Sequence, residues 1–250
     1  MSQMLLFNIG NTHTQWVFSD IKGNFIGEIE SLPSAAWQQD LTLLPSADSD
    51  TQVWAACVVP AAREVLQANK VYGQLHWINT ENAAEAGLDF SQVDSSTLGA
   101  DRIANAAALL QYELPAANFD CGTAITLEVV MPGGIFAGGA IAPGRKLMRC
   151  SLAAGTAALP ELPIAEAIPT QLGINTLQAL ALGIDGGSVG VVRELMRVAQ
   201  QRGVRTFVAS GGDAEFFCRG IKELSAAGCD FTLHGVAQIA SVWLGKHELS

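Results

Sequence analysis

The order of apolar and polar residues along the chain predicts short strands that alternate with helices. Runs rich in β-branched and aromatic residues predict strands at 15–19, 25–29, 53–59, 75–78, 127–130, 135–141 and 206–209. Apolar residues at helical spacing predict helices at 61–70, 101–114, 177–201 with an interruption at 183–190, and a last helix ending near 244. The chain is therefore expected to have an α/β fold.

The pattern of residues 7–14 (FNIGNTHT) returns at residues 119–126 (FDCGTAIT), 112 positions later. Phe, Gly and the last Thr are identical, and Asn8 falls opposite Asp120. Each copy continues into a strand, a turn and another apolar segment, so the match extends beyond the eight residues. The repeat predicts an internal duplication, with one domain at 1–115, a second at 116–250, and a ligand cleft between them.

Composition excludes several functional classes. The 250 residues are 49% hydrophobic and 15% charged, which is typical of a folded chain. With 24 acidic and 14 basic residues the formal charge is −10, so the chain lacks the basic clusters that bind nucleic acid. The first residues have no basic segment before an apolar run, and no apolar run approaches the length of a membrane span. Neither a secreted nor a membrane protein is expected.

The cysteines bear on compartment and metal binding. Their number is odd, and no pair has C-x-x-C spacing; they are residues 57, 121, 150, 218 and 229. Reduced thiols in a cytoplasmic protein are the simplest interpretation, and a zinc site is not expected.

Glycine is frequent, at 25 residues, and several glycines lie where turns are predicted. The two repeated turns, around Gly10 and Gly122, expose backbone N–H groups of the kind that bind phosphate. Further glycine-rich segments at 138–144 and 209–213 precede predicted helices, where anions or nucleotides bind. Such turns are also common without a ligand. Neither a P-loop nor a dinucleotide-binding G-x-G-x-x-G sequence occurs.

Two carboxylates stand out beside these turns. Asp101 begins a predicted helix, where an acidic residue often only caps the helix. With Arg102 it could instead accept a hydroxyl proton beside an anion-binding guanidinium. Asp120 ends an apolar strand at a Gly turn, so its charge needs a cation, an amide cluster or water.

Six segments, in this order and at this spacing, resemble those of the type III pantothenate kinases. They are 8–12 (NIGNT), 99–102 (GADR), 120–126 (DCGTAIT), 138–144 (GGAIAPG), 156–160 (TAALP) and 172–176 (LGINT). The resemblance covers nearly the whole chain. It implies two duplicated ribonuclease-H-like domains of the actin-like ATPase fold with a cleft between them. It also implies ATP-dependent phosphorylation of pantothenate, the first step of coenzyme A synthesis, by a homodimer that uses Mg²⁺ and a monovalent cation, K⁺ or NH₄⁺.

The resemblance also implies residue roles. Asp101 matches the general base, and Asp120 matches the ligand of the monovalent cation. The positions that match ATP contacts are Asn8, Ile9, Gly10, Asn11, Thr12, His13, Thr14, Gln15 and Thr123. The positions that match pantothenate contacts are Gln92, Gly99, Ala100, Asp101, Arg102 (at the carboxylate) and Thr176.

Three of these positions depart from the family's pattern. Asn8 replaces an Asp that helps hold Mg²⁺ and ATP, Gln15 replaces a Lys or Arg, and Gln92 replaces a Tyr that contacts pantothenate. Asn8 keeps an oxygen acceptor but loses the charge that attracts Mg²⁺. Three functions therefore remain open: a pantothenate kinase with altered activity, a kinase for another small hydroxy acid or sugar, or a non-catalytic nucleotide-binding or regulatory homologue.

Overall fold

The computed structural model describes residues 3–228 and 230–247, and it divides the chain into two compact units. The first unit comprises Met1–Glu113, Val130–Ala137 and Asp230–Ser250. The second comprises Leu114–Val129 and Gly138–Cys229. The chain thus returns to the first unit at residue 230, whereas the sequence assigned all of 116–250 to one domain.

The first unit contains a five-stranded sheet in the order β3-β2-β1-β4-β5. Its strands are β1 (Gln3–Ile9), β2 (His13–Asp20), β3 (Phe25–Pro33), β4 (Gln52–Cys57) and β5 (Gln74–Trp77). The strands β1, β2 and β3 form antiparallel hairpins, while β4 is parallel to β1 and β5 is parallel to β4.

A second sheet has the same arrangement, in the order β8-β7-β6-β9-β10, and lies in the second unit except for the end of β7 and the start of β8. Its strands are β6 (Ala116–Cys121), β7 (Ala124–Met131), β8 (Ile135–Pro143), β9 (Thr206–Ser210) and β10 (Ser225–Ala226). β9 is parallel to β6, as β4 is to β1. The equal strand order confirms the predicted duplication and the predicted α/β fold with two ribonuclease-H-like domains.

The helices lie where the sequence pattern predicts them, but several differ from the predicted length. They are α1 (Ser34–Trp37), α2 (Pro60–Ala68), α3 (Thr80–Glu85), α4 (Ala100–Leu109), α5 (Arg145–Gly155), α6 (Thr176–Ala181), α7 (Gly187–Gln201), α8 (Ala214–Gly220) and α9 (Phe231–His247), with short helical turns η1 (Leu41–Leu43) and η2 (Leu182–Gly186). α4 ends earlier than predicted because the N–H groups of residues 110–112 bond three residues back and tighten the last turn. The predicted interruption of the long helix is the π-helical turn η2.

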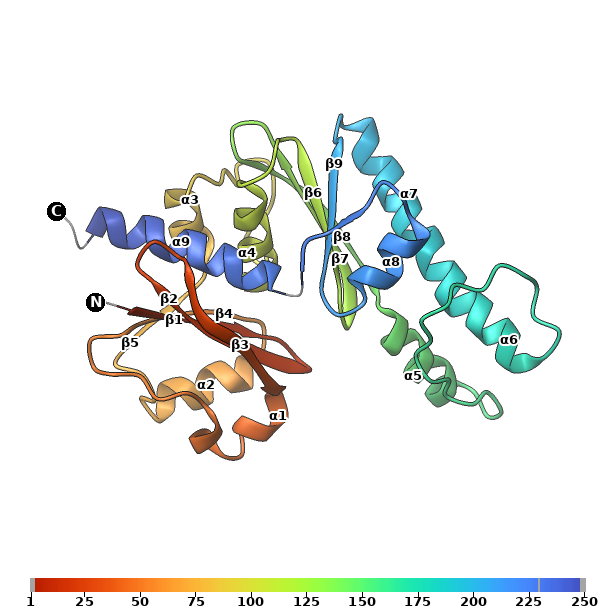
Figure 1. Ribbon diagram of the computed structural model, residues 1–250, viewed down its shortest axis with the longest axis horizontal. Coiled ribbons are helices and arrows are strands. Elements are labelled where there is room, and N and C mark those ends of the chain that lie inside the picture. Colours follow the sequence, from red (N-terminus) through yellow and green to blue (C-terminus); the bar gives the residue numbers. More distant parts are fainter. Residues whose placement is uncertain (1–2, 229, 248–250) are drawn as a thin grey trace. The chain divides into compact units, whose positions relative to one another are not determined.

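The strand β1 is buried on both faces. Leu5, Phe7 and Ile9 pack in a cluster with Ala62 and Leu66 of α2. The alternate face of β1 meets α9, so α2 and α9 cover opposite faces of this sheet (Figure 1). Burial on both faces explains why β1 reads as a continuous apolar run.

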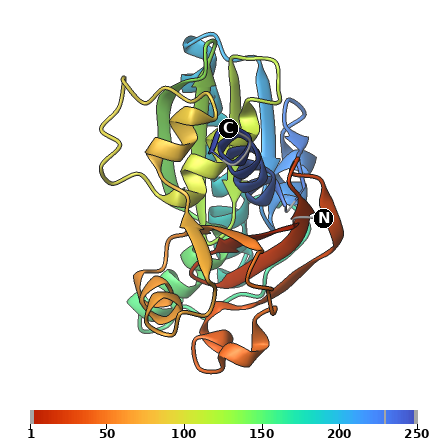
Figure 2. The same cartoon turned by 90° about the vertical axis from the view of Figure 1, so that its left-hand side faces the viewer.

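The helices α4 and α9 pack at very short distance, side by side in both views (Figures 1 and 2). A Cβ on Gly235 of α9 would lie 1.8 Å from the carbonyl oxygen of Ala104 in α4. Beside this crossing, Thr232 Oγ1 donates a hydrogen bond to Asn105 Oδ1 at 2.8 Å. Only glycine therefore fits at position 235 without separating the two helices.

We expect Gly235→Ala to lower the free energy of unfolding by about 1–3 kcal/mol, because overpacking forces the backbones apart. Gly245→Ala on the same helix is the matched control, since a Cβ there meets nothing within 4 Å. It should leave stability unchanged or raise it by up to about 1 kcal/mol through helix propensity. Denaturant unfolding of both variants measures the difference, and equal midpoints would contradict the role given to Gly235.

No helix in the described ranges is both long and apolar enough to cross a membrane. Four cysteines, Cys57, Cys121, Cys150 and Cys218, are free thiols, and Cys229 lies outside the described residues.

Candidate active site

The first glycine turn joins β1 to β2 and is open to solvent. Gly10 N–H donates to the carbonyl oxygen of His13 at 3.0 Å, which closes the turn. Asn11, Thr12 and His13 are exposed at its tip. The backbone of this turn is therefore accessible to a ligand, as a phosphate-binding loop requires.

A buried polar network fixes the base of this turn. Thr14 is fully buried, and its Oγ1 accepts a hydrogen bond from Trp37 Nε1 at 2.8 Å and contacts Ser34 Oγ at 2.9 Å. Ser34 Oγ donates in turn to the carbonyl oxygen of Gly10. The Thr14 side chain thus holds the turn against α1, and its own oxygen is occupied by these partners.

Two of the departures from the family's pattern face each other across this hairpin. Asn8 lies opposite Gln15 in the register of β1 and β2, and Asn8 Nδ2 donates to Gln15 Oε1 at 3.4 Å. In the pattern that the chain resembles, these positions carry an acid and a base. Compared with that pattern, this chain lacks one negative and one positive charge at the two positions, so the net charge of the pair is the same.

The helix α4 carries the candidate base in its first turn. Gly99 is the N-cap, and Asp101 Oδ1 accepts a hydrogen bond from the N–H of Arg102 at 2.7 Å. A Cβ at Gly99 would lie 2.6 Å from Asp101 Oδ1, so glycine leaves room for the carboxylate. Burial raises the pKa of the Asp101 carboxyl above its ordinary value, against the opposing effects of the Arg102 N–H and guanidinium. A partly desolvated carboxylate is suited to proton transfer.

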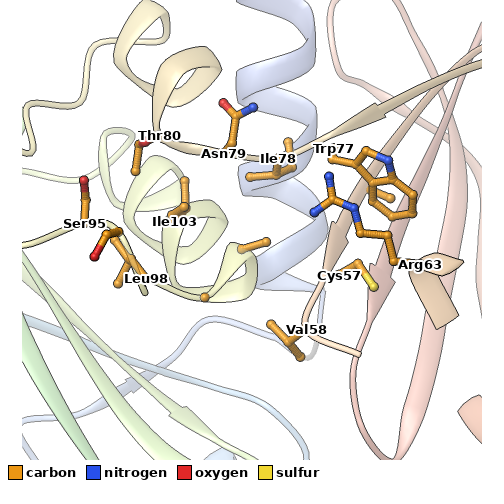
Figure 3. Close-up of a pocket in the computed structure, with 14 residues that line it drawn as sticks. Cys57, Val58, Arg63, Trp77, Ile78, Asn79, Thr80, Ser95, Leu98 and Ile103 are labelled. Atoms are coloured by element: carbon orange, nitrogen blue, oxygen red, sulfur yellow. The ribbon is translucent and has the colours of Figure 1, made fainter. Parts of the chain in front are cut away.

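A pocket of about 470 Å³ opens beside the start of α4 in the first unit (Figure 3). Gly99, Ala100 and Ile103 of the α4 region line it. Arg63 and Trp77 form another wall, with the Arg63 guanidinium 4.7 Å from the centre of the Trp77 ring. Gly99 thus lies next to both the pocket and the Asp101 carboxylate, while Asp101 itself is not among the lining residues.

In the second unit, three glycine turns meet at one edge of the sheet. Gly144 N–H donates to the carbonyl oxygen of Thr123 at 3.0 Å, and Asp213 N–H donates to that of Cys121 at 2.9 Å. A Cβ at Gly144 would lie 2.2 Å from the carbonyl oxygen of Gly122, so this approach needs glycine. The sequence singled out these turns separately, and the structure brings them together.

The Asp120 carboxylate lies within this group of turns. Asp120 is paired with Ser210 in the parallel register of β6 and β9. A Cβ at Gly211, whose φ is +82°, would lie 2.5 Å from Asp120 Oδ1. The turn of residues 210–213 therefore packs directly against the carboxylate.

The family assignment rests on a match along most of the chain. The family model described as type III pantothenate kinase matches residues 4–198. The chain belongs to the type III pantothenate kinase family. A protein of that name from Akkermansia muciniphila is 32% identical over 238 residues, covering 93% of this chain and 96% of that protein. Another, from Methylacidiphilum infernorum, is 29% identical over 249 residues, covering 97% and 90%.

Solved structures share the fold at lower identity. A chain described as a conserved putative Baf family transcriptional activator from Campylobacter jejuni has a TM-score of 0.66 at 17% identity, with 98% of this chain and 100% of that chain covered. The activator of 2-hydroxyisocaproyl-CoA dehydratase from Clostridium difficile, solved with bound ADPNP, has a TM-score of 0.54 at 12% identity, with 99% and 98% covered. At these identities both likenesses show the fold alone.

Four of the positions that the type III pantothenate kinase pattern assigns to substrate binding are not among the residues that line the pocket. Gln92 is exposed in the turn that follows Asp89, and it is not among the residues that line the pocket. Thr176, the first residue of α6, lies in the second unit beside an apolar pocket of about 550 Å³. Asp101 and Arg102 also do not line the 470 Å³ pocket, whereas Gly99 and Ala100 do.

Sequence reasoning missed the polar and aromatic side of this pocket. Arg63, Trp77 and Asn79 line it, together with Ser95 and Ser96. Arg63 lies just after β4, and Trp77 and Asn79 lie at or just after the end of β5. Ligands of open α/β sheets bind beyond the carboxyl ends of the parallel strands, so the residues after 53–59 and 75–78 could have been proposed together.

A buried ion network supports the second unit and also escaped sequence reasoning. Asp185 of η2 is fully buried and accepts a hydrogen bond at 2.8 Å from Arg145 Nε and two, each at 2.8 Å, from an Arg149 nitrogen. Arg145 also donates to Asp213 Oδ1 at 2.9 Å and lies over the Phe216 ring, 3.4 Å from its centre. Arg145 follows Gly144 directly, so the network ties α5 to the turn of residues 210–213.

Proposed function

We propose that the protein transfers the γ-phosphoryl group of ATP to the terminal hydroxyl of pantothenate, the first step of coenzyme A synthesis. The observation that carries this proposal is the start of α4, where a desolvated Asp101 carboxylate lies against Gly99, which lines a pocket together with Ala100. Membership of the type III pantothenate kinase family supports the substrate. We place the reaction in the cytoplasm.

Asp101 acts as the general base in this reaction. Its carboxylate accepts the proton of the attacking hydroxyl as that oxygen bonds to the γ-phosphorus. The bond from the γ-phosphorus to the bridging oxygen breaks, and ADP leaves with the electron pair. Hydrogen bonding of Oδ1 to the Arg102 N–H fixes the carboxylate, so its orientation does not depend on the substrate.

The glycine turns hold the nucleotide in this proposal. The open turn at residues 10–13 and the turns around Gly122 and Gly144 offer backbone N–H groups to phosphate oxygens. Asn8 and Gln15 are neutral, so neither position offers a carboxylate to Mg²⁺. Mg²⁺ would be held mainly by the ATP phosphates, whose charge it neutralises.

The residues around Asp120 fit a monovalent cation. The buried Ser210 Oγ has no hydrogen-bond partner among the described residues, and Ser210 pairs with Asp120 across β6 and β9. K⁺ takes oxygen ligands such as a carboxylate and a hydroxyl, and NH₄⁺ donates hydrogen bonds to the same oxygens. We propose that Asp120 and Ser210 hold this cation, which offsets negative charge beside the phosphates.

A homodimer is supported by apolar residues in the second unit. Leu172 and Ile174 are 85% and 90% exposed, and Leu152 and Leu177 are also exposed near the apolar pocket beside Thr176. Exposed apolar groups of this extent mark interaction surfaces. We propose that a second copy of the chain covers them, a state that analytical ultracentrifugation would establish.

A coupled assay of ADP release tests the proposed function. The protein with ATP, Mg²⁺ and NH₄⁺ should release ADP only when pantothenate is added, and the product should be its phosphate ester by mass spectrometry. Release with another hydroxy acid or sugar but not with pantothenate would assign a different substrate. No release with any of them, together with ATP binding, would establish a non-catalytic homologue.

The paired departures at Asn8 and Gln15 lead to a further prediction. Asn8→Asp alone places a carboxylate beside a neutral amide, whereas Asn8→Asp with Gln15→Lys restores an acid–base pair across β1 and β2. We expect the double variant to gain more in kcat than the two single variants combined, because the residues are in contact. Kinetics of the four proteins over a range of Mg²⁺ concentrations measure the coupling, and strictly additive changes would show that the two positions are independent.

A further inference from the structure

A second polar pocket in the first unit, also of about 470 Å³, shares no lining residue with the pocket at the start of α4. We call it the turn pocket. The turn between β2 and β3 contributes Lys22 and Phe25, the segment after α4 contributes Gln111, and α9 contributes His234 and Gln238. None of these residues has a place in the phosphoryl transfer proposed above, so the turn pocket needs an explanation of its own.

The turn between β2 and β3 forms one wall, and its conformation is fixed by Asp20. Asp20 Oδ1 accepts hydrogen bonds from the N–H groups of Lys22 at 2.8 Å and Asn24 at 2.9 Å, and Asp20 Oδ2 accepts one from Asn24 Nδ2 at 2.8 Å. Gly23 has a φ of +85°, and a Cβ there would lie 3.3 Å from Ala237 Cβ, so the turn packs closely on α9. A wall held in this way loses little conformational entropy when a ligand binds.

An aromatic stack ties this wall to α9. The rings of Phe25 and His234 are stacked, with centroids 4.4 Å apart and planes 11° apart. His234 Nε2 lies 3.1 Å from Asp230 Oδ2, which orients the imidazole ring. Two walls of the turn pocket are therefore joined by contacts that do not require a ligand.

The polar groups that line the turn pocket are available to a ligand. Within the described part of the chain, the Lys22 ammonium and the carboxamides of Gln111 and Gln238 have no hydrogen-bond partner. Lys22 is the one described lining residue with a fixed charge, and none of them is acidic, although the chain has 24 acidic and 14 basic residues. An ammonium and two amide N–H₂ groups donate hydrogen bonds, so this set favours an oxygen-rich anion.

The turn pocket lies on the two helices that pack at Gly235. His234 precedes Gly235 on α9, and Gly235 lies against the carbonyl oxygen of Ala104 in α4. α4 carries Asp101 in its first turn, and Gln111 follows its other end. An occupant of the turn pocket would thus contact α9 and the segment that ends the helix of the candidate base.

We infer that the turn pocket binds a small organic anion, a carboxylate or a phosphate ester, which acts as an effector of this enzyme without entering its active site. The volume suits a ligand of small-metabolite size. Binding is independent of the proposed function, whereas the effect on rate rests on it.

Calorimetric titration with citrate and with glycerol 3-phosphate tests the binding. The protein is first saturated with ADP, Mg²⁺ and pantothenate, which occupy the proposed active site. At least one of the two anions should bind once per chain, and the tighter one identifies the preferred acid group. Lys22→Met should weaken its binding about 10- to 100-fold, as expected for loss of a hydrogen bond to a charged group, and Gln238→Leu about 2- to 10-fold.

The choice of variants keeps the fold intact. Lys22 is exposed and bonds to Asp20 through its backbone N–H, so Lys22→Met leaves the turn in place. Lys222→Met is the matched control, because Lys222 is an exposed lysine of the second unit, and it should bind the anion as the parent does. If neither anion binds, or if Lys22→Met and Lys222→Met bind it equally, the inference is overturned.

Kinetics separate the effector role from the proposed function. The anion that binds should change kcat of the parent at least twofold and leave kcat of Lys22→Met unchanged, while the two proteins have equal kcat without it. An active enzyme whose kcat ignores the bound anion overturns the effector role. If the protein has no kinase activity but Lys22→Met weakens anion binding, the proposed function fails and the site stands. Kinase activity without anion binding gives the reverse result.

Discussion

Asp101→Asn should lower kcat for pantothenate phosphorylation by about 10²- to 10⁴-fold, the range expected for loss of a general base. The amide keeps the size of the side chain and an oxygen that can accept the Arg102 N–H, now bonded to Asp101 at 2.7 Å. It cannot accept the hydroxyl proton. KM for ATP should therefore stay close to that of the parent, and steady-state kinetics with each substrate varied in turn separate the two effects.

The stability of this variant provides an independent check. Burial raises the pKa of Asp101, so the folded state disfavours its ionised form relative to the unfolded state. That penalty is absent below the ordinary pKa of the group and is fully present above its raised pKa. At neutral pH Asp101→Asn should thus be at least as stable as the parent. An unfolded variant would mean that the loss of activity is structural.

The pH dependence of the parent enzyme follows from the same shift. Since the base must be ionised, the acid limb of kcat/KM should lie above the ordinary aspartate pKa, which is about 3.9. Asp94→Asn is a suitable control, because hydrogen bonds from Ser96 lower the pKa of Asp94, whose carboxylate is exposed. If the residual kcat/KM of the Asp101→Asn variant keeps the same acid limb, the limb reports the titration of another group.

Asp185→Asn should lower the free energy of unfolding by about 3–5 kcal/mol, the cost of breaking a buried ion pair by removing one partner. Asp185 is fully buried and accepts three hydrogen bonds of 2.8 Å from Arg145 and Arg149. An amide leaves two buried guanidinium groups facing an N–H donor, with less negative charge to balance them. The melting temperature should fall by about 10 °C, measured by calorimetry.

An exposed ion pair in the same unit is the matched control for Asp185. Glu194 and Arg197 form a pair at 2.6 Å on the surface of α7, with exposures of 59% and 54%. Water already solvates both groups, so Glu194→Gln should change stability by less than about 1 kcal/mol. Equal effects of the two substitutions would show that burial does not decide the contribution of the Asp185 network.

The same network links stability to the proposed nucleotide site. Arg145 joins Asp185 to Asp213, and the Asp213 N–H bonds to the carbonyl oxygen beside Gly122. Weakening the network loosens the turn of residues 210–213, which packs against Asp120. At temperatures below its melting temperature, the Asp185→Asn variant should therefore have a higher KM for ATP than the parent and an unchanged KM for pantothenate.

Local patterns in the sequence were sufficient for much of the fold. The apolar run at 53–59 became β4, and the helical spacing after Gly99 became α4, since strands and helices follow the periodicity of their own residues. The repeat of 7–14 at 119–126 predicted two similar domains, and both sheets have the same strand order. Gly99 and Ala100, which the resemblance implied as substrate contacts, line a pocket beside α4, and their contact with a substrate stays a prediction.

By itself, then, the sequence determined the α/β class, the duplication, the glycine turns and Asp101 at the start of a helix, because each depends on residues that are near one another in the chain. Tertiary structure alone decided which distant residues meet. It paired Arg63 with Trp77, and it joined Arg145 to Asp185 and Asp213. It also returned α9 to the first unit against α4. Such contacts arise from the packing of whole elements, and no periodicity in the intervening residues encodes them.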